Sequence, residues 1–110
     1  LIESICLFIL ESKTKQKHDY DGNLIKLYKR VASLLKMSPG DYEDDNLRQI
    51  LSGVFSIING VSGLRNTFSD SHGSAPSKTT YKIDERHAIL TVNLAKTITE
   101  YLFLSYEKSE

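Results

Sequence analysis

Residues 44–68, DDNLRQILSGVFSIINGVSGLRNTF, decide the fold because apolar residues recur in them at every third or fourth position. This spacing places apolar side chains along one side of an α-helix. The predicted stripe consists of Leu47, Ile50, Leu51, Val54, Ile58, Val61 and Leu64. The acids Asp44 and Asp45 suit a helix N-terminus. We therefore predict a long amphipathic helix that begins at Asp44 or Asp45 and continues to about Phe68.

Three further segments have apolar residues at helical spacing. They cover approximately Leu1–Lys13, Asn23–Lys36 and Asp84–Lys108. In the last segment, Asp84 is a suitable N-cap, and one side carries Leu90, Leu94, Ile98, Tyr101, Leu102 and Ser105. The stretches between the predicted helices are rich in small polar residues, Gly or Pro, and we expect them to be loops; they are Thr14–Gly22, Ser38–Asp41 and Ser69–Lys82. The pattern predicts an all-α fold, a bundle of four to five helices.

A row of small residues lies on another side of the third predicted helix. Gly53, Ser56, Gly60 and Gly63 are spaced three and four residues apart. Each Gly lowers helix stability by about 1 kcal/mol relative to Ala. We expect another helix to approach this row closely, and the alternative is a permissive, partly frayed helix.

The bulk composition describes an ordinary single domain. The chain has 110 residues, 40% of them hydrophobic and 25% charged, and its 14 basic and 14 acidic residues give no net charge. A neutral chain lacks the overall basic character of a general nucleic-acid binder. Binding of RNA would therefore depend on a local patch. We expect residues 1–110 to form one helical domain, the C-terminal module of a larger protein.

The single cysteine, Cys6, excludes a disulfide within the chain and fits a reducing cytoplasm. The longest apolar stretch, Ile5–Leu10, is too short to span a bilayer. We therefore expect a cytoplasmic protein without a membrane partner. Three scattered histidines and one cysteine give no metal-ligand spacing, so we expect neither a metal nor another cofactor.

The end of the third predicted helix carries the residues with chemical potential. Arg65 follows Val61 by four residues, and His72 follows Arg65 by seven, so both continue the apolar stripe if the helix continues. A buried arginine needs a partner, because an unpaired buried charge is costly. Asp70 is the nearest local candidate.

An arginine and a histidine are sufficient for RNA cleavage without a metal. The guanidinium group matches the geometry of a phosphate. Histidine, whose reference pKa is about 6.5, transfers protons near neutral pH. The spacing alone leaves two alternatives open, a structural ion pair and an arginine that caps helix carbonyls.

Several segments together resemble the abortive-infection protein C-terminal family. They are LRQILSG (47–53), NGVSGLRN (59–66), DSHG (70–73), RHA (86–88), VNLA (92–95) and YL (101–102), with the early Cys6 and the Leu27–Lys29 segment. The resemblance covers nearly the whole chain and keeps its order.

The resemblance implies a HEPN-like domain, an all-α fold that usually dimerises. Many HEPN proteins are metal-independent ribonucleases whose marker is an arginine, a neighbouring polar residue and a histidine. On this resemblance the catalytic residues are Arg65, Asn66 and His72, with Asp70 in a supporting role. Ser69 and Ser71 stand where the family often has Gly and Ala, which changes the backbone freedom of the turn.

The resemblance thus predicts an endoribonuclease module, a toxin or effector of phage defence, that acts on RNA as a homodimer. An upstream regulatory domain of the full-length protein would control it. The alternative is a non-catalytic dimerisation or interaction module, and a third possibility is nucleotide binding without turnover. Of the other histidines, we expect His87 to be structural rather than part of the site and His18 to be solvated.

Overall fold

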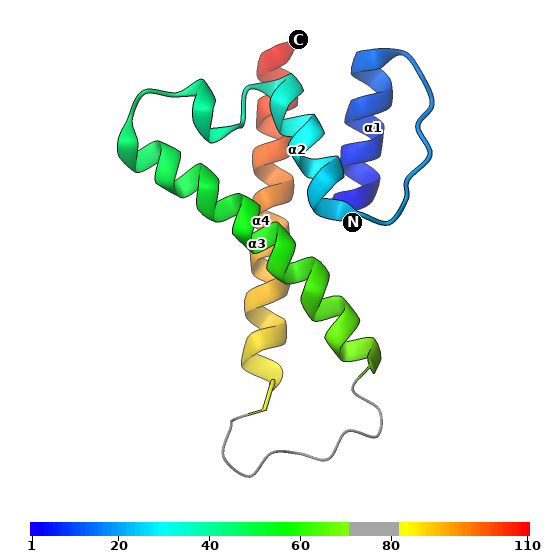
Figure 1. Cartoon of the computed structure of the whole chain (residues 1–110), viewed down its shortest axis with the longest axis vertical. Helices are drawn as coiled ribbons and strands as arrows, with labels where there is room; N and C mark the ends of the chain where they lie inside the picture. The colour runs from blue at the N-terminus through cyan, green and yellow to red at the C-terminus, as the bar shows by residue number, and fades with distance from the viewer. Residues whose placement is uncertain (71–81) are drawn as a thin grey trace.

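The structure of the chain, a computed structural model, describes residues 1–70 and 82–110, and for residues 65–70 it describes the backbone alone. The elements in chain order are α1 (Ile2–Thr14), α2 (Leu24–Leu35), the short 3-10 helix η1 (Pro39–Asp41), α3 (Asp45–Asp70) and α4 (Glu85–Ser109). The described residues contain no strand. The predicted all-α bundle is confirmed, and each predicted helix is present (Figure 1).

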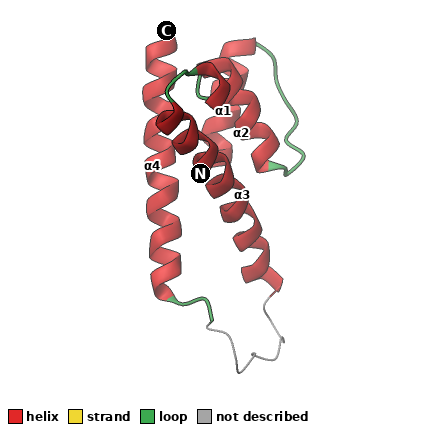
Figure 2. Cartoon of the chain, turned by 60° about the vertical axis from the view of Figure 1, so that its left-hand side comes forward, coloured by secondary structure: helices red, strands yellow, loops and turns green. Residues whose placement is uncertain are grey.

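The two long helices extend beyond the two short ones. α1 and α2 pack against each other and against the upper part of α4, and α2 also packs against α3 (Figures 1 and 2). Below this region α3 and α4 continue without cover from α1 or α2. The chain measures only 19 Å along its shortest axis, about two helix diameters. The molecule is therefore flat, and its long helices keep solvent-exposed faces.

The hydrophobic core lies where all four helices meet. Its fully buried members with the largest side chains are Tyr28, Ile9, Leu10, Met37, Ile58, Leu102, Val31 and Cys6. The rings of Tyr28 and Phe55 meet edge to face, with centroids 5.7 Å apart, which adds a favourable aromatic contact to the burial. Burial, followed by the charge of Glu3, raises the pKa of the Cys6 thiol to about 12, so this thiol is protonated at neutral pH.

Local sequence explains where the helices begin and end. The side chain of Asn23 accepts a hydrogen bond from the backbone N–H of Lys26 at 3.1 Å, which caps α2. The carboxylate of Asp44 accepts from the N–H of Leu47 at 2.8 Å and caps α3 in the same way. The residues directly after α1 and α2 are Lys15 and Lys36. Both have the left-handed backbone conformation that commonly ends a helix.

Three sequence-based expectations are wrong in detail. α3 continues through Asp70, so the predicted loop does not begin at Ser69. Ile50 and Leu90 belong to the predicted apolar stripes, yet they are 62% and 56% exposed. Ile50 lies about 80° around α3 from the buried Ile58, at the margin of the packed face. Leu90 lies in the part of α4 that α1 and α2 do not cover.

The row of small residues on α3 is not packed against another helix. A Cβ atom added at Gly53, Gly60 or Gly63 would meet no described atom within 4 Å. The expected close helix approach is therefore absent from the described part of this chain. A side chain at these positions would meet none of the described residues, and α3 retains helical geometry despite the low helix propensity of glycine.

Packing on α3 predicts a large contrast between two isoleucines of the same helix. Ile58 is 0% exposed and Ile50 is 62% exposed. We expect Ile58→Ala to lower the free energy of unfolding by about 2–5 kcal/mol, because it leaves a cavity in the core. Ile50→Ala should change it by less than about 0.5 kcal/mol. Urea unfolding of both variants measures the difference, and equal losses would contradict the described packing.

Candidate functional site

Two of the predicted catalytic residues, and the predicted supporting residue Asp70, lie at the far end of α3. Arg65 and Asn66 belong to the last two turns of this helix, and Asp70 is its final residue. Arg65 comes seven residues after the buried Ile58, two helical turns further along. His72 lies outside the described residues, and the side chains of Arg65, Asn66 and Asp70 are not described either. Convergence of Arg65 and His72 stays a prediction.

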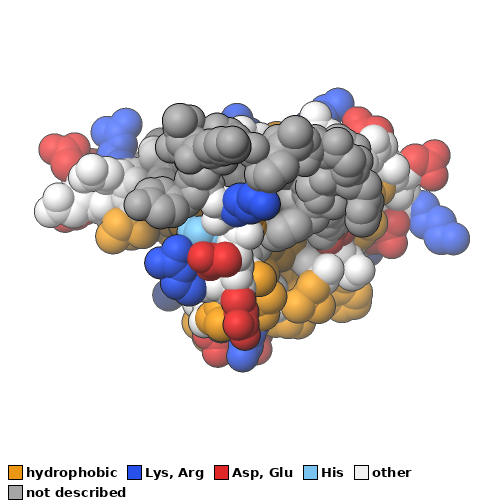
Figure 3. Space-filling model, turned by 90° about the horizontal axis from the view of Figure 1, so that it is seen from below, with side chains coloured by type: hydrophobic (Ala, Val, Ile, Leu, Met, Phe, Trp, Pro, Cys, Tyr) orange, Lys and Arg blue, Asp and Glu red, His pale blue; other side chains and the backbone are white. Residues whose placement is uncertain are grey.

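The described surroundings of this end include a hollow between α3 and α4. It has a volume of about 360 Å³ and is lined by Leu64, Lys82, Ile83, His87, Leu90 and Thr91. Leu64 precedes Arg65 directly in α3, whereas the other lining residues belong to the start of α4 and the segment just before it. Figure 3 views the molecule from this end and shows hydrophobic side chains exposed beside charged ones. The hollow thus adjoins the predicted catalytic position.

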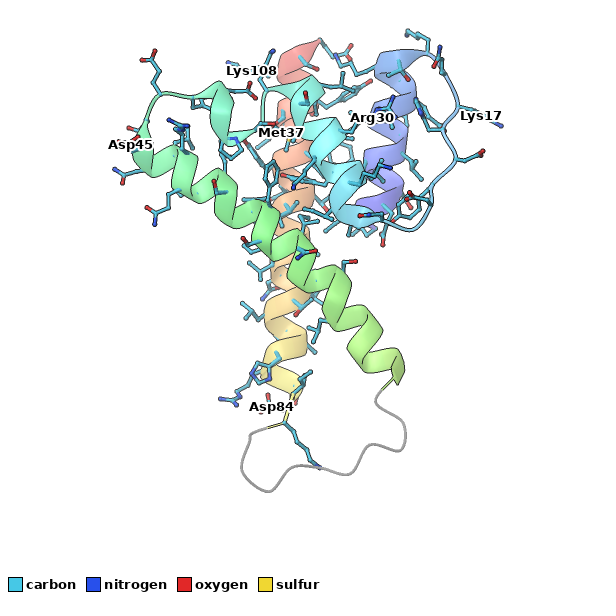
Figure 4. The ribbon with its side chains drawn as sticks, viewed as in Figure 1. Lys17, Arg30, Met37, Asp45, Asp84 and Lys108 are labelled. Atoms are coloured by element: carbon cyan, nitrogen blue, oxygen red, sulfur yellow. The ribbon has the colours of Figure 1, made fainter. Side chains whose placement is uncertain are left out.

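Several hydrogen bonds around Asp84 fix the start of α4. Figure 4 labels Asp84 at the lower end of this helix. The Asp84 carboxylate accepts from the backbone N–H of Arg86 at 2.9 Å, and the Arg86 guanidinium donates to the same carboxylate at 2.9 Å. The hydrogen bond from Arg86 is the main reason why the pKa of Asp84 is lowered. The predicted N-cap is confirmed.

His87 completes this cap from the third position of the helix. Its Nδ1 accepts a hydrogen bond from the backbone N–H of Asp84 at 3.0 Å. The same reciprocal arrangement usually uses Glu or Gln at this position, and the sequence signal is therefore an Asp followed three residues later by a side chain that can accept. A structural role for His87 is confirmed. His87 also lines the hollow beside Leu64, which its position in the sequence did not predict.

The cap also fixes the protonation pattern of the imidazole. Because Nδ1 acts as an acceptor in this hydrogen bond, the proton of the neutral ring is on Nε2. The hydroxyl of Thr91 donates to the carbonyl of His87 at 2.7 Å, so its oxygen remains able to accept. Two residues that line the hollow thus retain one donor and one acceptor that these hydrogen bonds do not use.

The charges in the described part of this end nearly balance. Lys82 and Arg86 carry positive charge, and Asp84 and Glu85 carry negative charge. Arg86 is bound to Asp84, which leaves Lys82 as the described cation that lines the hollow. Strong attraction of a polyanion by these residues alone is not expected. Binding of RNA here would depend on Arg65 and on shape.

Other candidate groups lie elsewhere or do not cluster. His18 is half-buried rather than merely solvated. Its ring Nε2 is 2.9 Å from the hydroxyl of Thr14, and its backbone N–H donates to the carboxylate of Glu11. Across the described ranges, no three His, Cys, Asp or Glu side chains come together as metal ligands would. Within those ranges, too, no helix combines the length and apolar character needed to cross a bilayer.

Comparison with known protein families assigns the chain to one of them. The family model described as a HEPN-like domain, that of the abortive infection C-terminal family, matches residues 1–106. The chain therefore belongs to this family, as the sequence motifs predicted. Comparisons with curated proteins and with solved structures find no significant match.

The hydrogen bonds that cap α4 predict how the stability of the fold depends on pH. The folded-state pKa of Asp84 is lowered, so its ionised form stabilises the fold above the unfolded-state pKa of about 3.9. This contribution is lost as the pH falls through the lower, folded-state pKa. Asp84→Asn keeps a capping side chain that cannot titrate. We expect the parent to lose stability relative to this variant below about pH 4.

Melting temperatures of both proteins between pH 7 and pH 2.5 test this prediction. The difference between the two curves should be constant above about pH 5 and should shrink in acid. Parallel curves over the whole range would show that the ionised Asp84 contributes nothing to the stability of the fold.

Proposed function

We propose that this chain is the metal-independent endoribonuclease module of an abortive infection protein, a toxin that acts in antiviral defence. The observation that carries the proposal is the match to the HEPN-like family over residues 1–106. Within it, Arg65 and Asn66 lie near the end of α3, and His72 follows them in the sequence in the family's order. Helix ends and the segments after them are frequent positions for functional residues, because a rigid scaffold holds them in place.

The proposed reaction uses the ribose itself as the nucleophile. His72 removes the proton from a 2′-hydroxyl, and the 2′-oxygen forms a bond to the adjacent phosphorus. The bond from phosphorus to the 5′-oxygen breaks, and this oxygen takes up a proton from solvent, to which His72 returns the proton that it removed. The products are a 2′,3′-cyclic phosphate and a 5′-hydroxyl, so atoms and charge balance without a further reactant.

The neighbouring side chains would support this step. The guanidinium of Arg65 would stabilise the negative charge that develops on the phosphoryl oxygens. Asn66 would orient the phosphate or the ribose through hydrogen bonds. Asp70 would hold the arginine or the histidine in position. Each of these roles is a proposal drawn from residue chemistry and from the family.

We propose further that the active form is a homodimer. Exposed apolar side chains gather on the uncovered half of α4, where Ile89 and Val92 are both more than half exposed. Such a surface favours association with a partner. A two-fold axis near this end would bring two copies of Arg65 and His72 toward one cleft. An upstream domain of the full-length protein would then control the module.

The alternative function is a non-catalytic dimerisation or interaction module of the same kind of protein. The exposed apolar face of α4 and the balanced charges around Asp84 favour this alternative. In that case the arginine and the histidine would form an interface network. The two functions differ in RNA cleavage, whereas both include a dimer.

Replacing the proposed general base tests the ribonuclease directly. We expect His72→Ala to reduce cleavage of labelled RNA by at least about a hundredfold in the presence of a chelator, because proton transfer typically contributes about 10²–10⁴-fold. The control is His18→Ala, which removes a histidine from the link between α1 and α2 and should retain activity. Undiminished cleavage by the His72 variant would exclude this mechanism.

The dimer has its own test. Val92 is 58% exposed on α4, and Val92→Glu would place a charge within the proposed interface, where its desolvation is unfavourable. We expect this variant to be monomeric in light scattering under conditions where the parent is a dimer. Leu34→Glu, at an exposed position of α2, is the control. A Val92→Glu protein that remains dimeric would place the interface elsewhere.

A further inference from the structure

We propose that the hollow between Leu64 and the start of α4 binds one nucleobase of the RNA, next to the phosphate that is cleaved. This inference rests on the proposed ribonuclease function and adds to it a subsite that selects the base. It would make His87 and Leu90 residues that determine specificity, whereas Arg65 and His72 would carry out the reaction.

The walls of the hollow are apolar, and a large part of their surface is open to solvent. Leu64 forms the side that belongs to α3, and Ile83 and Leu90 form the opposite side. Ile83 and Leu90 are 42% and 56% exposed, so a ligand would remove substantial apolar surface from water. The hollow, about 360 Å³, is wide open to solvent, so a flat ring would lie against its apolar wall rather than be enclosed.

The polar groups of the hollow suit the edge of a base. The cap turns Nδ1 of His87 toward the backbone of Asp84, and Nε2–H is therefore the donor that the ring offers to a ligand. The hydroxyl oxygen of Thr91 supplies an acceptor. Nucleobases combine apolar faces with donors and acceptors along their edges, and single-stranded RNA presents them unstacked.

The same features argue against a phosphate as the occupant. A phosphate site requires several cationic or N–H donors directed at one point, and Lys82 is the one cation among the described lining residues. Contact with three apolar side chains would strip water from the phosphodiester anion without replacing it, which is unfavourable. Arg65, one residue further along α3 than Leu64, carries the group suited to the phosphate, so the base and the phosphate would bind at the same end of this helix.

The experiment removes one wall of the hollow and compares it with a matched change. Leu90→Gln replaces an exposed leucine by a polar residue of good helix propensity. Leu104→Gln makes the same change on α4, where Leu104 is 65% exposed and does not line the hollow. Figure 4 shows that Lys108, near this control position in the sequence, lies at the opposite end of α4 from Asp84.

Four single-stranded RNAs that differ only in the base flanking one cleavage position are the probes. We expect Leu90→Gln to lower kcat/KM on the preferred RNA by roughly tenfold and to reduce the preference among the four. The Leu104→Gln protein should match the parent. His87→Gln keeps an acceptor for the cap but changes the donor geometry, and it should shift which base is preferred.

The outcomes separate the subsite from the ribonuclease. If the parent cleaves and Leu90→Gln retains its rate and preference, the subsite is wrong and the ribonuclease stands. An equal loss on all four RNAs, or a Leu90→Gln protein that no longer dimerises, also overturns the subsite. If the parent cleaves none of them, the ribonuclease fails. Binding of the same labelled RNAs, measured by fluorescence anisotropy, then tests the subsite separately. The subsite requires weaker binding by Leu90→Gln than by the parent and unchanged binding by Leu104→Gln.

Discussion

Burial of apolar side chains in only one half of the molecule is the constraint on which the rest of the structure depends. Tyr28, Ile58 and Leu102 are sealed where α1 and α2 pack against the two long helices. This contact holds α3 and α4 at a fixed crossing, although they make few contacts with each other. The positions of their lower ends follow from that crossing. A rigid core at one end therefore fixes the position of the proposed site at the other.

The uncovered half combines features that a self-contained fold would avoid. Exposed apolar side chains follow the first turns of α4, and side chains at the glycine positions of α3 would meet none of the described residues. Such surfaces favour association, which agrees with the proposed dimer. The cap formed by Asp84, Arg86 and His87 keeps the start of α4 in place at this surface. In this way one histidine can serve both the fold and a ligand.

Sequence reasoning succeeded where the determining forces are local. The four helices and the cap at Asp84 follow from apolar spacing and from side-chain hydrogen bonds within a few residues. It failed at Ile50 and Leu90, because helical periodicity shows which side of a helix is apolar and not how far its partners extend. The hollow beside Leu64 could not be predicted from the sequence either, because it depends on how α3 and α4 diverge in space. The motif that contains Arg65 and the family were recognised from the residues themselves.

The ends of the RNA fragments test the central claim most directly. The chain would be incubated in EDTA with a labelled RNA and with the same strand carrying a single 2′-deoxyribose at the cleaved position, and the fragments would be identified by mass spectrometry. Attack by the 2′-hydroxyl predicts a 2′,3′-cyclic phosphate and a 5′-hydroxyl from the first strand and no cut at that position in the second. Fragments with a 3′-hydroxyl and a 5′-phosphate, or equal cleavage of both strands, would contradict the account.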